Sequence, residues 1–586
     1  MMKIKTTVIT ILATLLISCA HQVAPGGGPE DTTPAEISVS HPAHGQTNVN
    51  RRAPIEITFS KWINLSSAKG AVSVYPPIPE GFSVKASKNW VKITPESPLK
   101  ENTTYHVIIA GTLQDLRGNS APKPIQLVFS TGDILDSAQL SGSVVSLDPF
   151  VTLPKIALYK EYEEWSDTAY FSAPDYMIPA DSGGAFKFSN LKEGKYRAVA
   201  FYDNSRAGKL RAGDKCYTPA EKTISVSTAE NFIRLYPAES DTLPPRINSI
   251  RAVDMNTLRG SWNKKFDSDR YKSPEWKIAA AAEDADLVRI NQTTMFANGI
   301  DFFITLHEPL KSGAYQFFYN YSDISDSLRF NAAIVPDTAH PVLKSHLPSG
   351  SANLTPELRL IWSKPVRVSQ NMITAVDTTE TDTAMFFCTN KYSDTTLLTL
   401  TKKLKPGLRY KISIPVQAVR DISGNMAVGT SGNKKDKKDG KEIKDSGNAD
   451  DSTAALDSVA LDSTAQDSVI TVFFNTISED SLCYRIHGGA QCLKAEEKRK
   501  WVYRPKGRDE TYITADKAGT FSFDSIPASK GTLYWFIDDN NDNLLTPGRL
   551  VPFRAPERFV VVPDSIEARA RWEIDNLQVK ACEDNE

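Results

Sequence analysis

Carboxylate and amide side chains recur along Asp538-Asp539-Asn540-Asn541-Asp542-Asn543 in a pattern that could bind a metal ion. Oxygens from Asp538, Asn540 and Asp542 would suit Ca²⁺, a hard cation that prefers oxygen ligands. The usual calcium-loop pattern is incomplete, because Asn543 stands where glycine is expected and Arg549 stands where the last acid is expected. Asp and Asn also form polar turns by bonding to their own backbone. The sequence therefore leaves two interpretations open, a calcium site and a self-bonded turn.

No other residues have the spacing of a catalytic centre. The sequence contains no Gly-x-Ser-x-Gly, His-Glu-x-x-His or glycine-rich phosphate loop. The eight histidines are scattered, and His41 and His44 have no third ligand nearby in sequence. There is also no Cys-x-x-Cys pair of the kind that binds zinc. We therefore expect a protein that is not an enzyme and that has no cofactor other than the candidate Ca²⁺.

The cysteines are few, which fits an oxidising compartment without making the chain a disulfide scaffold. Cys483 and Cys492 are close enough in sequence to link neighbouring strands, so we take them as a candidate disulfide.

The N-terminus has the features of a targeting segment. Lys3 and Lys5 precede an apolar run from residue 8 to 17, too short to cross a bilayer core of about 30 Å. The run ends in Leu16-Ile17-Ser18-Cys19, which resembles the lipobox of bacterial lipoproteins, including those of Bacteroidetes. The resemblance implies removal of residues 1–18 and acylation of Cys19, with the lipid bilayer as the first partner. Because no Asp follows Cys19, it also implies the bacterial outer membrane, with the leaflet left open.

A Gly/Pro-rich tether at 19–35 precedes a first predicted domain at 36–131. Alternating apolar residues there indicate strands with one buried face. Leu99–Asn119 contains a Leu-x-x-x-x-x-Tyr pattern ending at Tyr105, followed by Asp-x-x-Gly-Asn, and Leu404–Asn425 repeats both around Tyr410. These patterns resemble the tyrosine corner and a turn of Greek-key sandwiches. The segment as a whole is similar to the SbsA-type bacterial Ig-like domain.

Two further Ig-like domains are predicted. The one at 337–476 contains a charged segment at 427–468, which we expect to be disordered because it is rich in alternating charges and Asp-Ser pairs. The one at 241–335 repeats the corner one residue shorter but lacks the Asp-x-x-Gly-Asn turn.

A second domain type is predicted twice. Gly-x-Phe-x-Phe-x-x-Leu, a later Gly-x-Tyr and a strand ending in Asp occur around Phe186 to Asp203. The Phe, branched-apolar and Asp positions recur with the same spacing from Phe521 to Asp538. The pattern resembles the prealbumin-like sandwich of Cna-B and carboxypeptidase-regulatory domains. We place these domains at 137–237 and 479–575, followed by a tail at 576–586.

The sequence thus predicts an all-β chain of tandem β-sandwich domains. With 586 residues it is too long for one core, and a net charge of −2 argues against nucleic acid as a partner. We expect a non-enzymatic, lipid-anchored scaffold, spacer or binding stalk of the cell envelope that contacts an unidentified envelope protein or glycan. The alternative is a surface adhesin or glycan-binding lipoprotein, for which Trp62 and Trp165 are candidate exposed aromatics.

Overall fold

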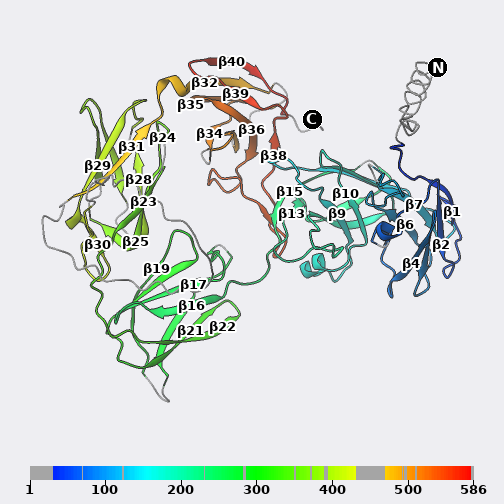
Figure 1. Cartoon of the computed structure of the whole chain (residues 1–586), viewed down its shortest axis with the longest axis horizontal. Helices are drawn as coiled ribbons and strands as arrows, with labels where there is room; N and C mark the ends of the chain where they lie inside the picture. Colours follow the sequence, from blue (N-terminus) through cyan, green and yellow to red (C-terminus); the bar gives the residue numbers. More distant parts are fainter. Residues whose placement is uncertain are drawn as a thin grey trace, which may run out of the picture. The chain divides into compact units, whose positions relative to one another are not determined.

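The chain is almost entirely β-structure, which confirms the predicted fold class. The computed structural model describes residues 31–581, apart from 69, 122–123, 230, 269, 282–285, 349–350, 370–371, 389–392, 401, 430–468, 491–492, 494–497 and 509–510. Within these ranges no helix has the length and apolar character needed to cross a membrane. The described residues divide into two compact units (Figure 1). Unit 1 comprises Met1–Ser240 and Pro547–Pro556, and unit 2 comprises Asp241–Thr546 and Glu557–Glu586.

Unit 1 begins with a two-sheet sandwich. One sheet has the order β1-β2-β5-β4 and the other has the order β3-β6-β7. The strands are β1 (Ile37–His41), β2 (Ile55–Phe59), β3 (Val72–Tyr75), β4 (Phe82–Ser87), β5 (Trp90–Pro95), β6 (Thr104–Ile109) and β7 (Ile125–Ser130), with a short helix α2 (Leu65–Ala68). Along β2 buried residues alternate with more exposed ones, because one face of its sheet is in contact with solvent. By contrast, every residue of β6 is buried.

Unit 2 repeats this sandwich at 247–331. Its sheets have the orders β16-β17-β20-β19 and β18-β21-β22, which match those of the first sandwich strand for strand. The strands are β16 (Ile247–Ala252), β17 (Thr257–Trp262), β18 (Glu275–Ala280), β19 (Ile290–Met295), β20 (Asp301–Leu306), β21 (Ala314–Tyr321) and β22 (Ile324–Asn331).

The next sandwich of unit 2 has the same two strand orders, joined here by an added pairing of β26 with β27. The strands are β23 (Leu343–Leu347), β24 (Ser351–Ala352), β25 (Leu358–Val368), β26 (Met372–Asp377), β27 (Thr383–Cys388), β28 (Ser393–Leu400), β29 (Arg409–Pro415), β30 (Val419–Asp421) and β31 (Val469–Thr476). In all three sandwiches the register of the opening strand shifts at the same place, after Ile37, Ile247 and Leu343. A shared irregularity of this kind supports three copies of one fold.

The other domain type has eight strands, and its pairings also occur twice. In unit 1 these are β8 (Ala138–Val144), β9 (Lys155–Lys160), β10 (Tyr176–Pro179), β11 (Ala185–Leu191), β12 (Gly194–Phe201), β13 (Cys216–Pro219), β14 (Ile224–Val226) and β15 (Phe232–Glu239). In unit 2 they are β32 (Leu482–Gly489), β33 (Arg499–Pro505), β34 (Tyr512–Ala515), β35 (Thr520–Pro527), β36 (Ser529–Ile537), β38 (Phe559–Val561), β39 (Ile566–Ala568) and β40 (Glu573–Gln578).

The first and last strands of each eight-stranded domain run parallel, β8 with β15 and β32 with β40. In each domain the central strand pairs with two short return strands in the same way, β12 with β13 and β14, and β36 with β38 and β39. In the described residues the unit 1 copy differs in two ways. Its β13 pairs with β15 and joins its strands into one sheet, whereas the unit 2 copy has two sheets. A short strand β37 (Gly548–Arg549) joins the sheet of unit 1 along β15.

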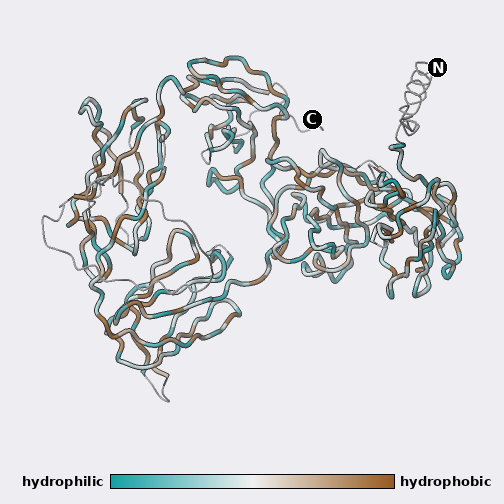
Figure 2. The backbone as a smooth tube through the Cα atoms, in the orientation of Figure 1, coloured by the Kyte–Doolittle hydropathy of each residue, from teal (hydrophilic) through white to brown (hydrophobic). Residues whose placement is uncertain are grey.

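Each sandwich has its own apolar core. Brown apolar segments alternate with teal polar ones along the strands in Figure 2, as expected where one sheet face is buried. Aromatic residues fill equivalent positions on β2, β17 and β25, namely Phe59, Trp262 and Trp362, all nearly inaccessible to solvent. The most deeply buried large side chains of the eight-stranded domains include Tyr196 and Trp535.

Three predicted boundaries move. Ala427, placed at the start of the insertion, is buried and donates its backbone N–H to Val419 O at 3.0 Å, and Val428 bonds to Pro341 O. Folded structure therefore continues past 427, and residues 430–468 lie outside the described part. The expected tail begins inside β40, and Ala581 is buried and accepts a hydrogen bond from Trp535 Nε1.

The third change concerns the tether. Its last residues, from Asp31 onward, are bonded to the first sandwich rather than free of it, through the contacts described below.

Candidate functional site

Asp538, the first candidate calcium ligand, is buried at the end of β36 and bonds to its own loop. Its Oδ1 accepts the N–H of Asp542 at 3.1 Å, and its Oδ2 accepts that of Asn543 at 3.2 Å. Asn541 and Asn543 have positive φ angles, which Asn tolerates better than most residues and which let the chain turn around the carboxylate.

The other two candidate ligands also bond within the loop. Asn540 donates from Nδ2 to Asp542 Oδ2 at 2.9 Å, and Asp542 Oδ1 accepts the N–H of Leu544 at 2.7 Å. The buried Glu557 closes the loop by accepting the N–H groups of Asp539 and Thr546. Burial raises the pKa of the Glu557 carboxyl, against the lowering effect of these amide bonds.

The corresponding loop of unit 1 has the same design without the acidic series. Asp203 accepts the N–H of Ala207 at 2.8 Å and that of Gly208 at 3.1 Å, the same relative positions as in the Asp538 loop. Lys155 Nζ lies 2.9 Å from Asp203 Oδ2. Among the described residues, no three His, Cys, Asp or Glu side chains converge as a metal site. The loop thus has the hydrogen bonds of a self-bonded turn, and the Ca²⁺ site stays a prediction.

Tyr105 and Tyr410, predicted as corner residues, are buried at the start of equivalent strands. The Tyr105 hydroxyl accepts the N–H of Lys100 at 2.8 Å, and the Tyr410 hydroxyl accepts that of Lys405 at 3.3 Å. Tyr410 also donates to Asp382 Oδ2 at 2.7 Å. Tyr315, in the sandwich with the shorter corner, accepts the N–H of Lys311 at 3.1 Å. These bonds tie a strand to the turn that precedes it.

The Asp-x-x-Gly-Asn segments form tight turns and also hold the domain's incoming linker. Asn119 Nδ2 donates to Asp115 Oδ2 within the turn and to Asp31 O in the linker, at 2.9 and 2.8 Å. Asn425 makes the same two bonds to Asp421 and Asp337. Gly118 and Gly424 have φ near +88°, which explains the glycine at this place in the motif.

A lysine two residues after the aromatic residue of β2, β17 or β25 completes this arrangement, which we call the linker clamp. Lys364 Nζ contacts Asp337 Oδ2 at 2.6 Å, Ala339 O at 2.8 Å and Asp421 Oδ2 at 2.8 Å. The clamp centred on Lys61 binds Asp31 Oδ2 and Thr33 O, and that centred on Lys264 binds Asp241 Oδ2 and Leu243 O. Each lysine therefore holds the Asp that opens its domain together with the carbonyl two residues later.

In these clamps the lysine lowers the pKa of the aspartate that it contacts. Burial opposes ionisation of Asp337, but hydrogen bonding and attraction from Lys364 outweigh it and hold the pKa below its usual value. At Asp31 the hydrogen bond from Lys61 is the largest cause of a lowered pKa. An Asp-Thr pair opens all three domains and a Ser-Lys pair occurs in two of them. Only the folded chain shows that the Asp and Lys meet.

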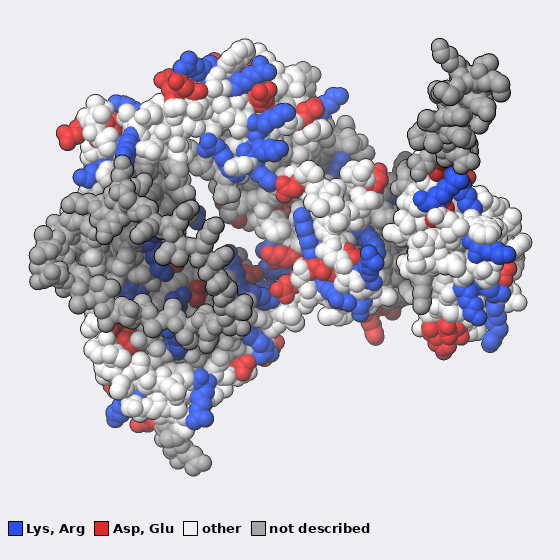
Figure 3. Space-filling view, viewed as in Figure 1, with Lys and Arg blue, Asp and Glu red and all other residues white. Residues whose placement is uncertain are grey.

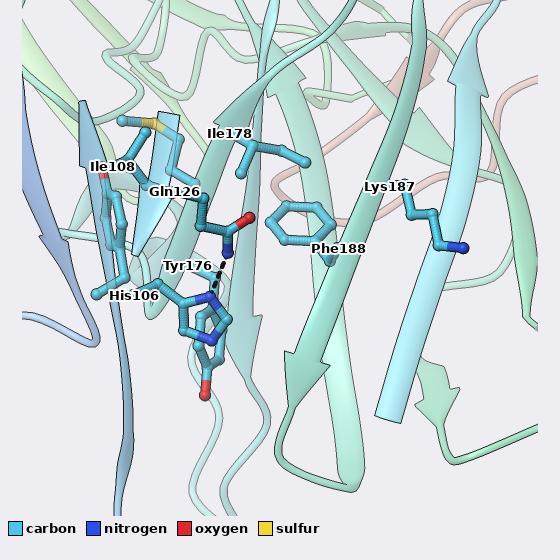
Figure 4. A pocket seen from close by; sticks show the side chains of 9 residues that line it. His106, Ile108, Gln126, Tyr176, Ile178, Lys187 and Phe188 are labelled. Carbon is cyan, nitrogen blue, oxygen red and sulfur yellow. Dashed lines mark hydrogen bonds between the residues drawn. The ribbon is translucent and has the colours of Figure 1, made fainter. Parts of the chain in front are cut away.

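A buried histidine that the sequence did not single out lies between the two domains of unit 1. His106 on β6 points toward Tyr176 on β10, with ring centroids 5.3 Å apart (Figure 4). Gln126 Nε2 lies 2.6 Å from His106 Nδ1, and Asn190 O lies 3.1 Å from Nε2. With Gln126 donating to Nδ1, the Nε2–H of a neutral ring donates to Asn190 O. Burial lowers the pKa of His106 to about 4.

Cys483 carries a free thiol in the structure. Its Sγ lies 3.3 Å from Trp572 O, in the core of its domain. Cys492 itself lies outside the described residues, as does Cys19.

The two candidate exposed tryptophans differ. Trp62 is 57% exposed, as expected. Trp165 instead packs against Tyr159 and Tyr170, and the Arg197 guanidinium lies 4.9 Å from its ring centroid. The polar sequence around Trp165 concealed this contact, because Tyr159 and Arg197 lie on the strands β9 and β12.

Surface charge is mixed on the face shown in Figure 3, where Lys and Arg lie among Asp and Glu without a broad field of one sign. This agrees with the net charge of −2 and lends no support to a polyanion-binding surface.

Comparison with known proteins identifies the first sandwich. The bacterial Ig-like domain family matches residues 31–131, so the domain begins at the clamped Asp31 rather than at residue 36. No curated protein sequence matches the chain.

Among solved structures, bacterial surface layer protein SbsC, domains 1–6, is 10% identical and the match covers 92% of this chain and 68% of that one, with a TM-score of 0.15. Chicken CNTN1 FN1–FN3 is 7% identical over 56% of this chain and 99% of that one, with a TM-score of 0.15. The chain covers 44% of the N-terminal part of SbsC and 64% of rSbsC, at 14% and 10% identity and TM-scores of 0.15 and 0.16. These similarities concern the β-sandwich fold alone.

Proposed function

We propose that this chain is a lipid-anchored, non-enzymatic scaffold or stalk of the bacterial outer membrane. The observation that carries the proposal is the repetition of two β-sandwich types, in which the Ig-like copies fix their incoming linkers with the same Lys–Asp clamp. Linkers held in this way restrict the bending of a domain against the segment that precedes it. Such construction suits a part that sets reach and orientation.

The N-terminus supplies the other half of the proposal. Leu16-Ile17-Ser18-Cys19 resembles a lipobox, and acyl chains on Cys19 would hold the chain at the bilayer. The tether between Cys19 and the clamped Asp31 is short and rich in glycine and proline. The first sandwich would therefore stand close to the membrane surface.

The repeated motifs of the sequence also support a role without catalysis. The Asp, Asn and Tyr side chains that could have formed a reaction centre are engaged in turns and corners. The Ig-like sandwich is a fold that is typically non-catalytic, and sites on it are usually placed in loops or along edge strands.

Chemical crosslinking in native envelopes, followed by purification of the chain, tests the scaffold role. We expect the wild-type chain to bring down a defined envelope protein or glycan-bearing component, and the unanchored Cys19→Ser chain to lose it. Cys582→Ser serves as the matched cysteine substitution. Equal recovery with and without Cys19 would contradict an anchored scaffold, and so would the absence of any specific product.

The second candidate function is a surface adhesin or glycan-binding lipoprotein, favoured by the exposed ring of Trp62, since such rings stack on sugars. Protease treatment of intact cells separates the candidates, because only a surface-displayed chain is cut. Complete protection of the chain would exclude the adhesin.

A further inference from the structure

One short segment of the chain lies in a sheet that is far from it in sequence. The strand β37 pairs in parallel with β15, with Gly548 opposite Ala238 and Arg549 opposite Glu239. Leu550 then donates its N–H to Glu239 O at 3.0 Å. Residues 547–556, which we call the arm, thereby become part of unit 1 (orange beside β13 and β15 in Figure 1).

The arm contributes to the core as well as to the sheet. The side chain of Leu550 is 0% exposed and belongs to the apolar core of the eight-stranded domain of unit 1, with Val551 packed partly against it. A leucine buried this fully anchors a peptide in the way that an anchor residue fills a pocket.

Polar contacts fix the register of the arm. Arg549 Nε lies 3.3 Å from Glu239 Oε2, and the arginine side chain is only 8% exposed. Gly548 lies so close to Thr218 and Pro556 that a Cβ there would approach both at 3.0 Å. The sequence Gly-Arg-Leu is therefore matched to this edge by size, charge and apolar character.

The arm is itself a hairpin. Arg549 and Arg554 exchange backbone hydrogen bonds, each of 2.9 Å, and Arg554 Nη2 donates to Pro547 O. These bonds hold the arm in the shape in which it docks.

The duplicated domain makes the same connection in a shorter form. In unit 1, residues 202–215 connect Phe201 to Cys216, and Leu210 after the Asp turn is buried in the core of unit 1. The equivalent connection from Ile537 to Phe559 closes its Asp loop in the same way but is seven residues longer, and its Leu550 is buried in the same core of unit 1. The docking of this longer connection calls for a separate explanation.

We propose that the edge of β15 at Ala238 and Glu239 is a strand-accepting site, and that a second copy of this chain can supply the arm to it. The arm is then a tethered ligand that ordinarily fills the site of its own chain. Exchange of one identical element between copies is a low-cost route to a dimer, and strand addition at a sheet edge supplies backbone bonds while a side-chain pocket supplies specificity. The proposal does not depend on the membrane anchor.

Peptide binding tests the site on the whole chain. A fluorescent peptide of residues 545–558 is titrated into the wild type and into a chain whose arm is replaced by a Gly/Ser segment of equal length. We expect saturable binding to the arm-replaced chain and at least about tenfold weaker binding to the wild type, whose own arm competes at high effective concentration. A Leu550→Ala peptide should bind at least about tenfold more weakly. The proposal is wrong if the arm-replaced chain, with normal hydrogen exchange in β8 and β12, binds neither peptide or binds both equally.

Disulfide trapping tests the exchange and does not require removal of the arm. Chains carrying Glu239→Cys are mixed with chains carrying Arg549→Cys, and the doubly substituted chain reports pairing within one copy. We expect the mixture to give a disulfide between copies whose yield rises with protein concentration. A disulfide that forms only in the doubly substituted chain would overturn supply of the arm by a second copy.

Discussion

At the scale of single residues, the Tyr105 hydroxyl ties β6 to the turn before it, because it accepts the N–H of Lys100. Tyr105→Phe removes this acceptor and leaves the ring in place. A lost buried hydrogen bond costs about 1 kcal/mol, so exchange of the Lys100 amide should accelerate roughly fivefold. Tyr162→Phe, which changes an exposed tyrosine, is the control. Unchanged exchange at Lys100 would count against the corner.

His106 makes the stability of unit 1 depend on pH. Its pKa is about 4 in the folded chain and near its ordinary value of 6.5 in the unfolded chain. Between these values the unfolded state binds more protons, so the free energy of unfolding falls as pH falls from 6.5 toward 4. The full effect is about 3 kcal/mol, since each pKa unit corresponds to about 1.4 kcal/mol. The stabilisation is complete above 6.5.

Urea unfolding, followed through hydrogen exchange of peptides from β6 and β10, measures this dependence. His106→Gln should flatten the profile in that pH window, leaving the contribution of other nearby groups. Asp136 and Asp175 carry the charges that act on the residues of this interface, and Lys187 lines the same cavity (Figure 4). If the free energy of unfolding falls with pH equally steeply in the wild type and in His106→Gln, protonation of His106 is not the cause of the lost stability.

At the scale of elements, the linker clamps differ in burial, and their strengths should differ in the same order. Lys364, Asp337 and Asp421 are 15%, 10% and 3% exposed. Removal of the lysine therefore leaves two largely buried carboxylates without the cation that pairs with them. Lys364→Met should destabilise the 337–476 sandwich by roughly 3–5 kcal/mol, whereas Lys61→Met, at a more exposed clamp, should cost about 1 kcal/mol or less. Differential unfolding by hydrogen exchange measures both.

Lys411→Met, at an exposed position of β29, provides the matched control for Lys364→Met. If the control destabilises the sandwich as much as Lys364→Met does, the clamp is not the cause.

The Asp538 loop should behave as a turn. Asp538→Ala removes both acceptors and should expose the amides of Asp542 and Asn543 to faster exchange, as Asp203→Ala should for Ala207 and Gly208. Millimolar Ca²⁺ should leave wild-type exchange in this loop unchanged. Asp539→Ala, at an exposed side chain, is the control. If Ca²⁺ slows amide exchange in the wild-type loop and Asp538→Ala abolishes this effect, the loop is a calcium site.

Elements were predictable where the information is local. Alternation along β2, the Tyr105 corner and the Asp-x-x-Gly-Asn turns depend on residues close in sequence, and the repeats gave each a second example. The contacts missed by sequence reasoning join distant residues. Nothing near His106 indicates Asn190 as its partner, and nothing near Leu550 indicates the core of unit 1.

At the scale of the whole molecule, the two domain types repeat with little change while three features vary. These are the anchor region before Asp31, the segment 430–468 and the arm. The residues of the repeated motifs form corners, turns and clamps. We therefore expect the specific function of this chain to depend on the three variable features. Of these three features, the arm has a visible structural role, because it pairs with β15 and adds Leu550 to the core of unit 1.

The central claim is a β-sandwich scaffold held in the outer membrane by Cys19, and cell fractionation tests it most directly. We predict that the wild-type chain sediments with outer membranes and is released by detergent, that Cys582→Ser behaves identically, and that Cys19→Ser is recovered in the soluble fraction with unchanged hydrogen exchange in its sandwiches. Recovery of folded Cys19→Ser with the outer membrane, or of the wild type in the soluble fraction, would contradict the account.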